Sequence, residues 1–169
     1  MAAGKAWTVT EGGGPVVACA VHAGSDVRAE VLRHLAVRRR QRFALVYLDV
    51  DGLKRVNDSK GHGAGDLALK ELAAVLRRSL RKRDFAARLG GDEFALLLPG
   101  AESATATGIA EKVLSGLGDA MPADHRIGAS IGIVPDAQRF TTTEAVRKAD
   151  TAMYASKTAG GSRITVAEV

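Results

Sequence analysis

Four acidic side chains stand where two strands of this 169-residue chain would end. Asp49 and Asp51 close an apolar run, and the alternation of side chains along a strand places both on one face. Asp92 and Glu93 are adjacent, which is unusual in a strand because neighbouring carboxylates repel and Asp is a poor strand former. Carboxylates on rigid strand ends favour a hard divalent cation. The pattern therefore predicts a metal site for phosphate chemistry, if the two strand ends lie side by side.

Two consecutive glycines, Gly90 and Gly91, precede the second acidic pair and stand between two strand-like segments. A tight turn between antiparallel strands needs positive φ, which glycine adopts without steric cost. Residues 84–98 are therefore expected to form a β-hairpin with the acidic pair at its tip. An exposed turn without function would explain this segment alone, but not its occurrence together with Asp49.

Apolar periodicity alternates between helix and strand over the rest of the chain. Residues 25–169 are expected to form one domain, preceded by a loose N-terminal segment over 1–24 that includes a short strand at 15–21. Helices against one face of a mostly antiparallel sheet make an α+β fold. The expected helices span 26–40, 67–80, 102–117 and 143–157, and the expected strands, besides the hairpin, span 43–48, 127–134 and 162–166.

Composition restricts the class of protein. Hydrophobic residues make up 46% and charged residues 25%, as in a globular domain with a sizeable core. No apolar run reaches the roughly 18 residues of a membrane span, and no signal peptide is recognisable. The single cysteine, Cys19, excludes an intrachain disulfide and suits the cytoplasm, where we expect the protein. A net charge of +5 with 4% aromatic residues favours nucleotides over single-stranded nucleic acid as partners.

Five segments resemble the motifs of one family. Gly90-Gly91-Asp92-Glu93-Phe94 spells the signature of GGDEF domains, the diguanylate cyclases. The resemblance implies a palm-like, ferredoxin-type antiparallel central sheet flanked by helices, and the condensation of two GTP into cyclic di-GMP and two pyrophosphates. It covers about residues 41–166 in the family's order, and the other similar stretches lie at 47–58, 61–66, 130–133 and 149–154.

The resemblance also implies roles for the acidic residues. Side chains matching Asp49, Asp92 and Glu93 hold Mg²⁺ or Mn²⁺, two ions per active site, and the backbone carbonyl of Val50 adds a ligand. Asp92 and Glu93 are also the catalytic acids of the family. Each site holds one GTP, so the resemblance implies a homodimer in which two sites face each other.

Substrate recognition is implied at six positions. Asn57 and Asp66 match the residues that recognise guanine, because an amide and a carboxylate can pair with its polar edge. Without the resemblance, an Asx turn at Asn57 and an N-cap at Asp66 would be the simpler interpretations. Lys54 and Lys157 match phosphate contacts but are otherwise ordinary surface lysines. The glycines Gly90 and Gly91 allow the nucleotide to approach the backbone closely.

A product-binding site is implied just before the hairpin. Arg81 and Asp84 match the family's Arg-x-x-Asp inhibitory motif, and Arg88 is the expected helper. An arginine can grip phosphate with two donors while an aspartate accepts from guanine, so feedback inhibition by cyclic di-GMP is expected. The alternative interpretation is an exposed ion pair of little energetic weight.

Three positions depart from the family. The stretch at 18–26 does not show the motif that usually precedes the first helix, Gly52 stands where an aromatic residue is common, and Gly161 replaces an arginine that contacts phosphate. The departures at 18–26 and at Gly161 support an alternative function, a degenerate domain that binds cyclic di-GMP or GTP and signals to a partner. A cyclase for another base disagrees with Asp66, and a polymerase or DNA-binding module lacks room and a docking motif.

Overall fold

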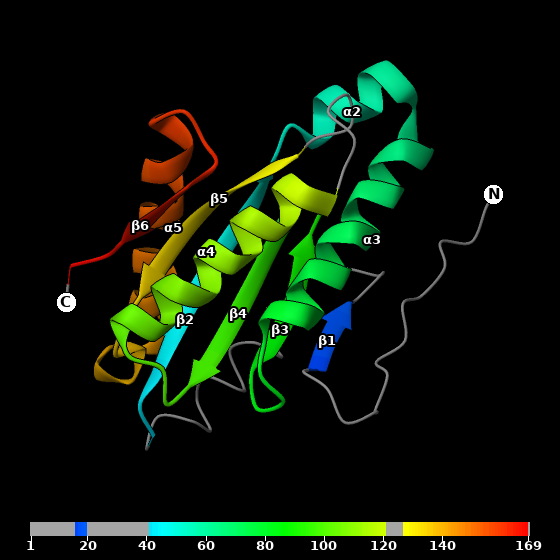
Figure 1. Cartoon of the computed structure of the whole chain (residues 1–169). Coiled ribbons are helices and arrows are strands. Elements are labelled where there is room, and N and C mark those ends of the chain that lie inside the picture. The colour runs from blue at the N-terminus through cyan, green and yellow to red at the C-terminus, as the bar shows by residue number, and fades with distance from the viewer. Residues whose placement is uncertain (1–15, 20–40, 121–126, 169) are drawn as a thin grey trace.

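The computed structural model describes residues 16–19, 41–120 and 127–168. Within these ranges six strands form one sheet in the order β1-β3-β4-β2-β5-β6 (Figure 1). The strands are β1 Val16–Cys19, β2 Phe43–Asp51, β3 Phe85–Gly90, β4 Glu93–Pro99, β5 Gly128–Val134 and β6 Arg163–Val166. The helices are α2 Leu53–Lys60, α3 His62–Ser79, α4 Ser103–Ala120, the 3₁₀ turn η2 Ala137–Arg139 and α5 Thr142–Thr158.

The centre of the sheet is antiparallel, as the sequence predicts. β2 pairs antiparallel with β4 on one side and with β5 on the other, and β4 pairs with β3 in the predicted hairpin. The two edges are parallel, because β1 lies beside β3 and β6 beside β5. The short N-terminal strand therefore belongs to the main sheet, and the α+β fold is confirmed in a mixed form.

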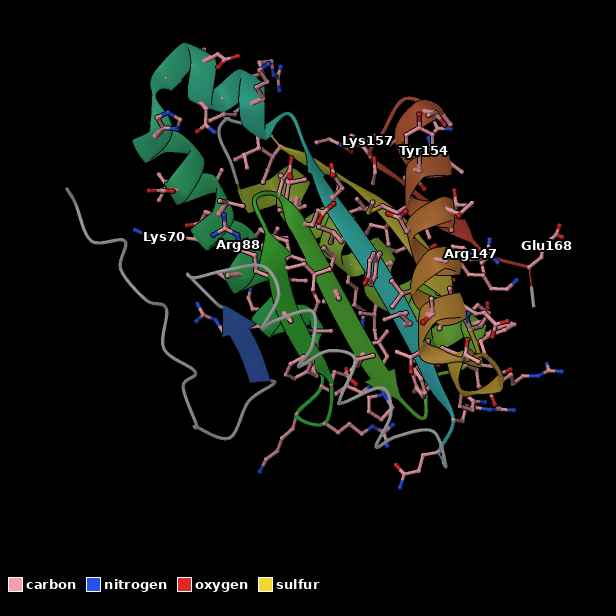
Figure 2. All side chains as sticks on the ribbon, turned by 180° about the vertical axis from the view of Figure 1, so that it is seen from behind. Lys70, Arg88, Arg147, Tyr154, Lys157 and Glu168 are labelled. Carbon is pink, nitrogen blue, oxygen red and sulfur yellow. The ribbon has the colours of Figure 1, made fainter. Side chains whose placement is uncertain are left out.

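Helices cover both faces of the sheet, so the expectation that they occupy one face is wrong. Even-numbered side chains of β2, such as Val46 and Leu48, pack in a cluster with α3 and α4. Odd-numbered ones, such as Leu45 and Tyr47, pack with α5 on the opposite side. Figure 1 shows α3 and α4 in front of the sheet, and Figure 2 shows α5 on the reverse face.

The region between β2 and the hairpin differs most from the prediction. Two helices, α2 and α3, replace the single helix expected over 67–80. Asn57 lies within α2 and Asp66 within α3, so neither the Asx turn nor the N-cap is formed. Gly52 and Gly61, with φ of 83° and 84°, instead precede the two helices. The apolar period over α2 is too short to reveal a helix of eight residues.

The other predicted helices and strands within the described residues are present, but some of their ends differ from the prediction. β2 runs on to Asp51, and α4 continues to Ala120, past the expected end at residue 117. The helix expected over 26–40 and most of the 18–26 stretch lie outside the described residues. No helix in the described part of the chain is both long and apolar enough to cross a membrane.

Close packing of α5 on β5 depends on Gly132. A Cβ atom at Gly132 would overlap the carbonyl oxygen of Ala149 and the amide nitrogen of Met153, both on α5. A capping box stabilises the start of α5. The Thr141 hydroxyl oxygen accepts from the amide of Glu144, and the Glu144 carboxylate accepts from the amide of Thr141. These contacts fix the helix that carries Lys157 toward the end of β2.

Candidate active site

The two acidic strand ends lie side by side, as the sequence predicts. Asp49 on β2 is the register partner of Glu93 on β4. One residue further on, the amide of Val50 donates to the carbonyl oxygen of Asp92 at 3.0 Å. The antiparallel ladder therefore brings Asp49, Asp92 and Glu93 to one end of the sheet, with Asp92 and Glu93 half-buried.

Asp49 is a buried carboxylate with a lysine partner. It is 5% exposed, and Lys157 Nζ lies 2.7 Å from its Oδ1. Burial raises the pKa of Asp49; the bond from Lys157 opposes this, and the charge of Asp92 raises it further. The pKa of Lys157 is also raised, chiefly by its bond to Asp49. Figure 2 shows Lys157 at the end of α5 that faces β2.

Asp51, in contrast, is occupied by structural hydrogen bonds. Its carboxylate accepts from Ser130 Oγ at 2.9 and 3.0 Å and from the amide of Ser162 at 2.8 Å. Gly161 has a φ of 71°, and a Cβ atom there would lie 2.8 Å from Asp51 Oδ2. The glycine that replaces the family's arginine is thus required by the turn that Asp51 holds.

The carboxylates fit a divalent cation by their chemistry. Among the residues described by the structure, no three His, Cys, Asp or Glu side chains form a ready-made metal site. The positive charge beside these carboxylates is the Lys157 ammonium: its bond to Asp49 and the negative charges of Asp49, Asp92 and Asp51 raise its pKa. Oxygen donors with excess negative charge suit Mg²⁺ or Mn²⁺, and Asp49, Asp92 and Glu93 are the residues that would hold it.

The hairpin tip is open to solvent. A Cβ atom at Gly90 or Gly91 would meet nothing within 4 Å, and Gly91 has a φ of 49°. Arg88 on β3 secures the tip, since its Nε and Nη2 donate to the Gly91 carbonyl oxygen at 2.9 and 2.6 Å. Figure 2 shows Arg88 at the hairpin. The open backbone gives a ligand direct access beside Asp92.

The two residues expected to recognise guanine lie on the two helices that follow β2. Asn57 is half-buried between α2 and α3, while Asp66 is exposed on α3. Asn57 Oδ1 is buried and has no hydrogen-bond partner within the described residues. Lys54, in the first turn of α2, is exposed.

The Arg-x-x-Asp segment forms a closed turn. The amide of Arg81 donates to Asp84 Oδ2 at 2.7 Å, and the amide of Asp84 donates to the Arg81 carbonyl at 2.9 Å. Asp84 is 2% exposed, whereas the Arg81 side chain is exposed. Arg88, the expected helper, lies four residues further along β3 and bonds the hairpin tip.

Known proteins match both the sequence and this geometry. The family model described as "Diguanylate cyclase, GGDEF domain" matches residues 26–163. The chain belongs to the GGDEF domain family. The chain is 47% identical over 133 residues to the probable diguanylate cyclase DgcE of Escherichia coli K12. This match covers 76% of this chain and 12% of that protein. It is 43% identical over 141 residues to the bifunctional cyclase/phosphodiesterase MucR of Pseudomonas aeruginosa, covering 80% of this chain and 20% of that protein.

A solved GGDEF domain has the same fold. The GGDEF domain of DgcB from Caulobacter crescentus, in complex with c-di-GMP, superposes with a TM-score of 0.78 at 27% identity, covering 99% of this chain and 100% of that one. The chain spans between about an eighth and a fifth of the length of DgcE and MucR.

Two sets of hydrogen bonds in this GGDEF domain are not predictable from the sequence motifs. The bonds of Asp51 to Ser130 and Ser162 join residues far apart in the chain, and no local pattern signals them. The contact of Arg88 with Gly91 is not implied by the family resemblance, which gives Arg88 only a role at the product site. A basic residue three positions before a tight turn is the one signal that favours such a bond.

Proposed function

We propose that this chain is a diguanylate cyclase domain that condenses two GTP into cyclic di-GMP and releases two pyrophosphates. The observation that carries the proposal is the register of β2 beside the hairpin, which sets buried Asp49 opposite Glu93 and next to Asp92. A GGDEF domain with this acidic end has the oxygen donors for transfer of a nucleotidyl group. Relatives named as diguanylate cyclases support the same reaction.

The reaction joins the 3′-hydroxyl of one GTP to the α-phosphate of the other by in-line displacement. Two Mg²⁺ or Mn²⁺ ions held by Asp49, Asp92, Glu93 and the Val50 carbonyl would neutralise charge that develops on the phosphate oxygens. Asp92 and Glu93 are the catalytic carboxylates: one of them would accept the proton of the attacking 3′-hydroxyl while the bond between the α-phosphate and the leaving pyrophosphate breaks.

The remaining substrate contacts are assigned by position. Lys157 and Lys54 would contact phosphate oxygens, so Lys157 must exchange Asp49 for the nucleotide when GTP binds. Asn57 and Asp66 would pair with guanine, and the open backbone at the hairpin glycines would admit the nucleotide. Gly161 stands where the resemblance implies an arginine that contacts phosphate, and its φ of 71° and the nearby Asp51 carboxylate leave no room for a side chain there.

Two further features complete the proposal. Each domain binds one GTP, so two chains form a homodimer that brings the two sites together. Cyclic di-GMP binds at Arg81 and Asp84, with Arg88 nearby, and inhibits synthesis. The exposed Arg81 guanidinium is available for phosphate, while the buried Asp84 fixes the turn. We place the reaction in the cytoplasm, the compartment that supplies GTP.

Product analysis tests the proposal. The purified chain is incubated at high concentration with GTP and Mg²⁺ or Mn²⁺, and products are identified by chromatography and mass. Asp92→Asn and Glu93→Gln should abolish cyclic di-GMP without unfolding the domain. Asp119→Asn and Glu111→Gln make the same chemical changes at exposed positions of α4, a helix that carries none of the candidate site residues, and should retain synthesis. Equal products from all five proteins, or none from wild type where dimers form, would reject the assignment.

A further inference from the structure

The half-buried Asn57 side chain packs against α3 at a position where that helix has no side chain. Gly65 on α3 is buried, and its backbone lies directly against the Asn57 side chain on α2. A Cβ atom at Gly65 would overlap Asn57 Oδ1 and lie 2.8 Å from Asn57 Cγ. Real Cβ atoms essentially never approach other heavy atoms below 3.0 Å, so the carboxamide occupies the volume that any larger residue would fill.

The carboxamide oxygen of Asn57 gains no hydrogen bond from its buried position within the described part of the chain. Asn57 Oδ1 is buried and without a hydrogen-bond partner within the described residues. A buried acceptor that is left unpaired costs free energy, so each such group in a native protein calls for an explanation, such as an ordered water, a ligand or a catalytic role. The oxygen is a hydrogen-bond acceptor, and the exocyclic amino group of guanine is a matching donor. Because this oxygen has almost no exposed surface in the ligand-free domain, the base reaches it only if the side chains around Asn57 shift on binding.

Gly65 differs in this respect from the other glycine inside the same helix. Gly63 lies two residues earlier on α3, and a Cβ atom there would meet nothing within 4 Å. Neither glycine has the positive φ that would itself demand glycine. Ala is the better helix former, so α3 alone gives no reason for glycine at either position. Only at Gly65 does the fold require the missing side chain, and the reason is Asn57.

We propose that Gly65 is a positioning residue for guanine recognition. Because Gly65 has no side chain, it leaves the space in which the Asn57 carboxamide lies, and this position orients the carboxamide toward the 2-amino group of the base. Gly65 itself touches no substrate. The inference rests on the proposed function, because it assumes that the base of GTP binds at Asn57.

Inosine triphosphate provides the discriminating probe, because it differs from GTP only by the absent 2-amino group. The affinity of the metal-loaded protein for GTP and for inosine triphosphate is measured directly by calorimetry, alongside kcat/KM for each. In Gly65→Ala we expect the preference for GTP over inosine triphosphate to fall by about tenfold, as for loss of one base contact of roughly 1.4 kcal/mol. Gly63→Ala, the matched control, should keep the wild-type preference. A purely structural role for Gly65 would lower both affinities equally.

A double-mutant cycle tests the route through Asn57. Asn57→Ala removes the carboxamide and should itself reduce the preference for GTP. In that background Gly65→Ala should have no further effect on the preference, because the overlapping group is gone. An unchanged preference in Gly65→Ala, or an equal loss with and without Asn57, would overturn the inference.

The outcomes separate this inference from the proposed function. If wild type makes cyclic di-GMP and Gly65→Ala keeps its preference for GTP, only the role of Gly65 fails. If wild type binds GTP selectively through Asn57 and Gly65 but makes no cyclic di-GMP, the inference holds and the cyclase assignment fails. If wild type does not distinguish the two nucleotides, the inference is wrong regardless of product.

Discussion

Replacing Lys157 by methionine should expose the electrostatic cost of the acidic site. The substitution keeps a long apolar side chain but removes the ammonium that lies 2.7 Å from Asp49 Oδ1. Asp49 then remains buried beside Asp92 and Asp51 without its cation. We therefore expect the metal-free domain to lose stability, and to lose it mainly where Asp49 would be ionised.

The burial of the two partners sets the magnitude. The Asp49 side chain is 8% exposed, but that of Lys157 is 47% exposed, so water screens one side of the pair. Removing a partner from a fully buried pair costs about 3–5 kcal/mol, whereas an exposed pair contributes at most about 1 kcal/mol. For this half-exposed pair we expect a loss of about 1–2 kcal/mol in the free energy of unfolding near neutral pH.

The sign of the pH dependence follows from the pKa of Asp49. Burial already raises this pKa, and the bond from Lys157 opposes the rise, so removal of Lys157 raises it further. A carboxyl whose pKa is raised by folding destabilises the folded state at pH above that pKa and ceases to do so once it is protonated. The deficit of Lys157→Met should therefore shrink as pH falls toward about 4, the ordinary pKa of Asp.

The assay is denaturant unfolding in EDTA at several pH values, with Lys112→Met as control. Lys112 is exposed on α4, which carries none of the candidate site residues, and its replacement should change stability by under about 0.5 kcal/mol. A loss in Lys157→Met no larger than in the control would refute the ion pair. A loss that is the same at pH 4.5 and pH 7 would refute its link to Asp49.

Three other substitutions test the framework that positions the site, each by denaturant unfolding. Gly132→Ala should cost about 1–3 kcal/mol or more, because its Cβ meets backbone atoms of α5, whereas Gly108→Ala on α4 meets open space and should not destabilise. Thr141→Ala should cost about 1 kcal/mol by removing the capping box of α5, and an unchanged midpoint would contradict the cap. Asp51→Ala should cost about 1–3 kcal/mol, since Ser130 and the amide of Ser162 lose their acceptor; stability equal to wild type would mean that the turn holds without it.

The acidic end of the sheet was predictable because its signals are local. Alternation along β2 and the Gly-Gly turn of the hairpin fix the strands, and the antiparallel pairing expected of them brings Asp49 beside Glu93. The long helices α4 and α5 follow from their apolar period in the same way. The predicted metal donors therefore lie together, on elements whose existence the sequence indicates.

The remaining errors concern contacts between distant segments. The short, largely polar α2 shows too few apolar residues to be recognised, so Asn57 and Asp66 were not expected on paired helices. Which face α5 covers depends on how the chain crosses the sheet, and local periodicity carries no such information. The bond of Lys157 to Asp49 spans 108 residues, and the proposed phosphate role of Lys157 gave no hint of it.

The most direct test of the central claim is the stoichiometry of the products. Wild type and Asp92→Asn are incubated with GTP and Mg²⁺ at equal concentration, and cyclic di-GMP and pyrophosphate are quantified in the same samples. The account predicts two pyrophosphates for each cyclic di-GMP with wild type and neither product with the variant. Pyrophosphate or phosphate without cyclic di-GMP, or equal synthesis by Asp92→Asn, would contradict it.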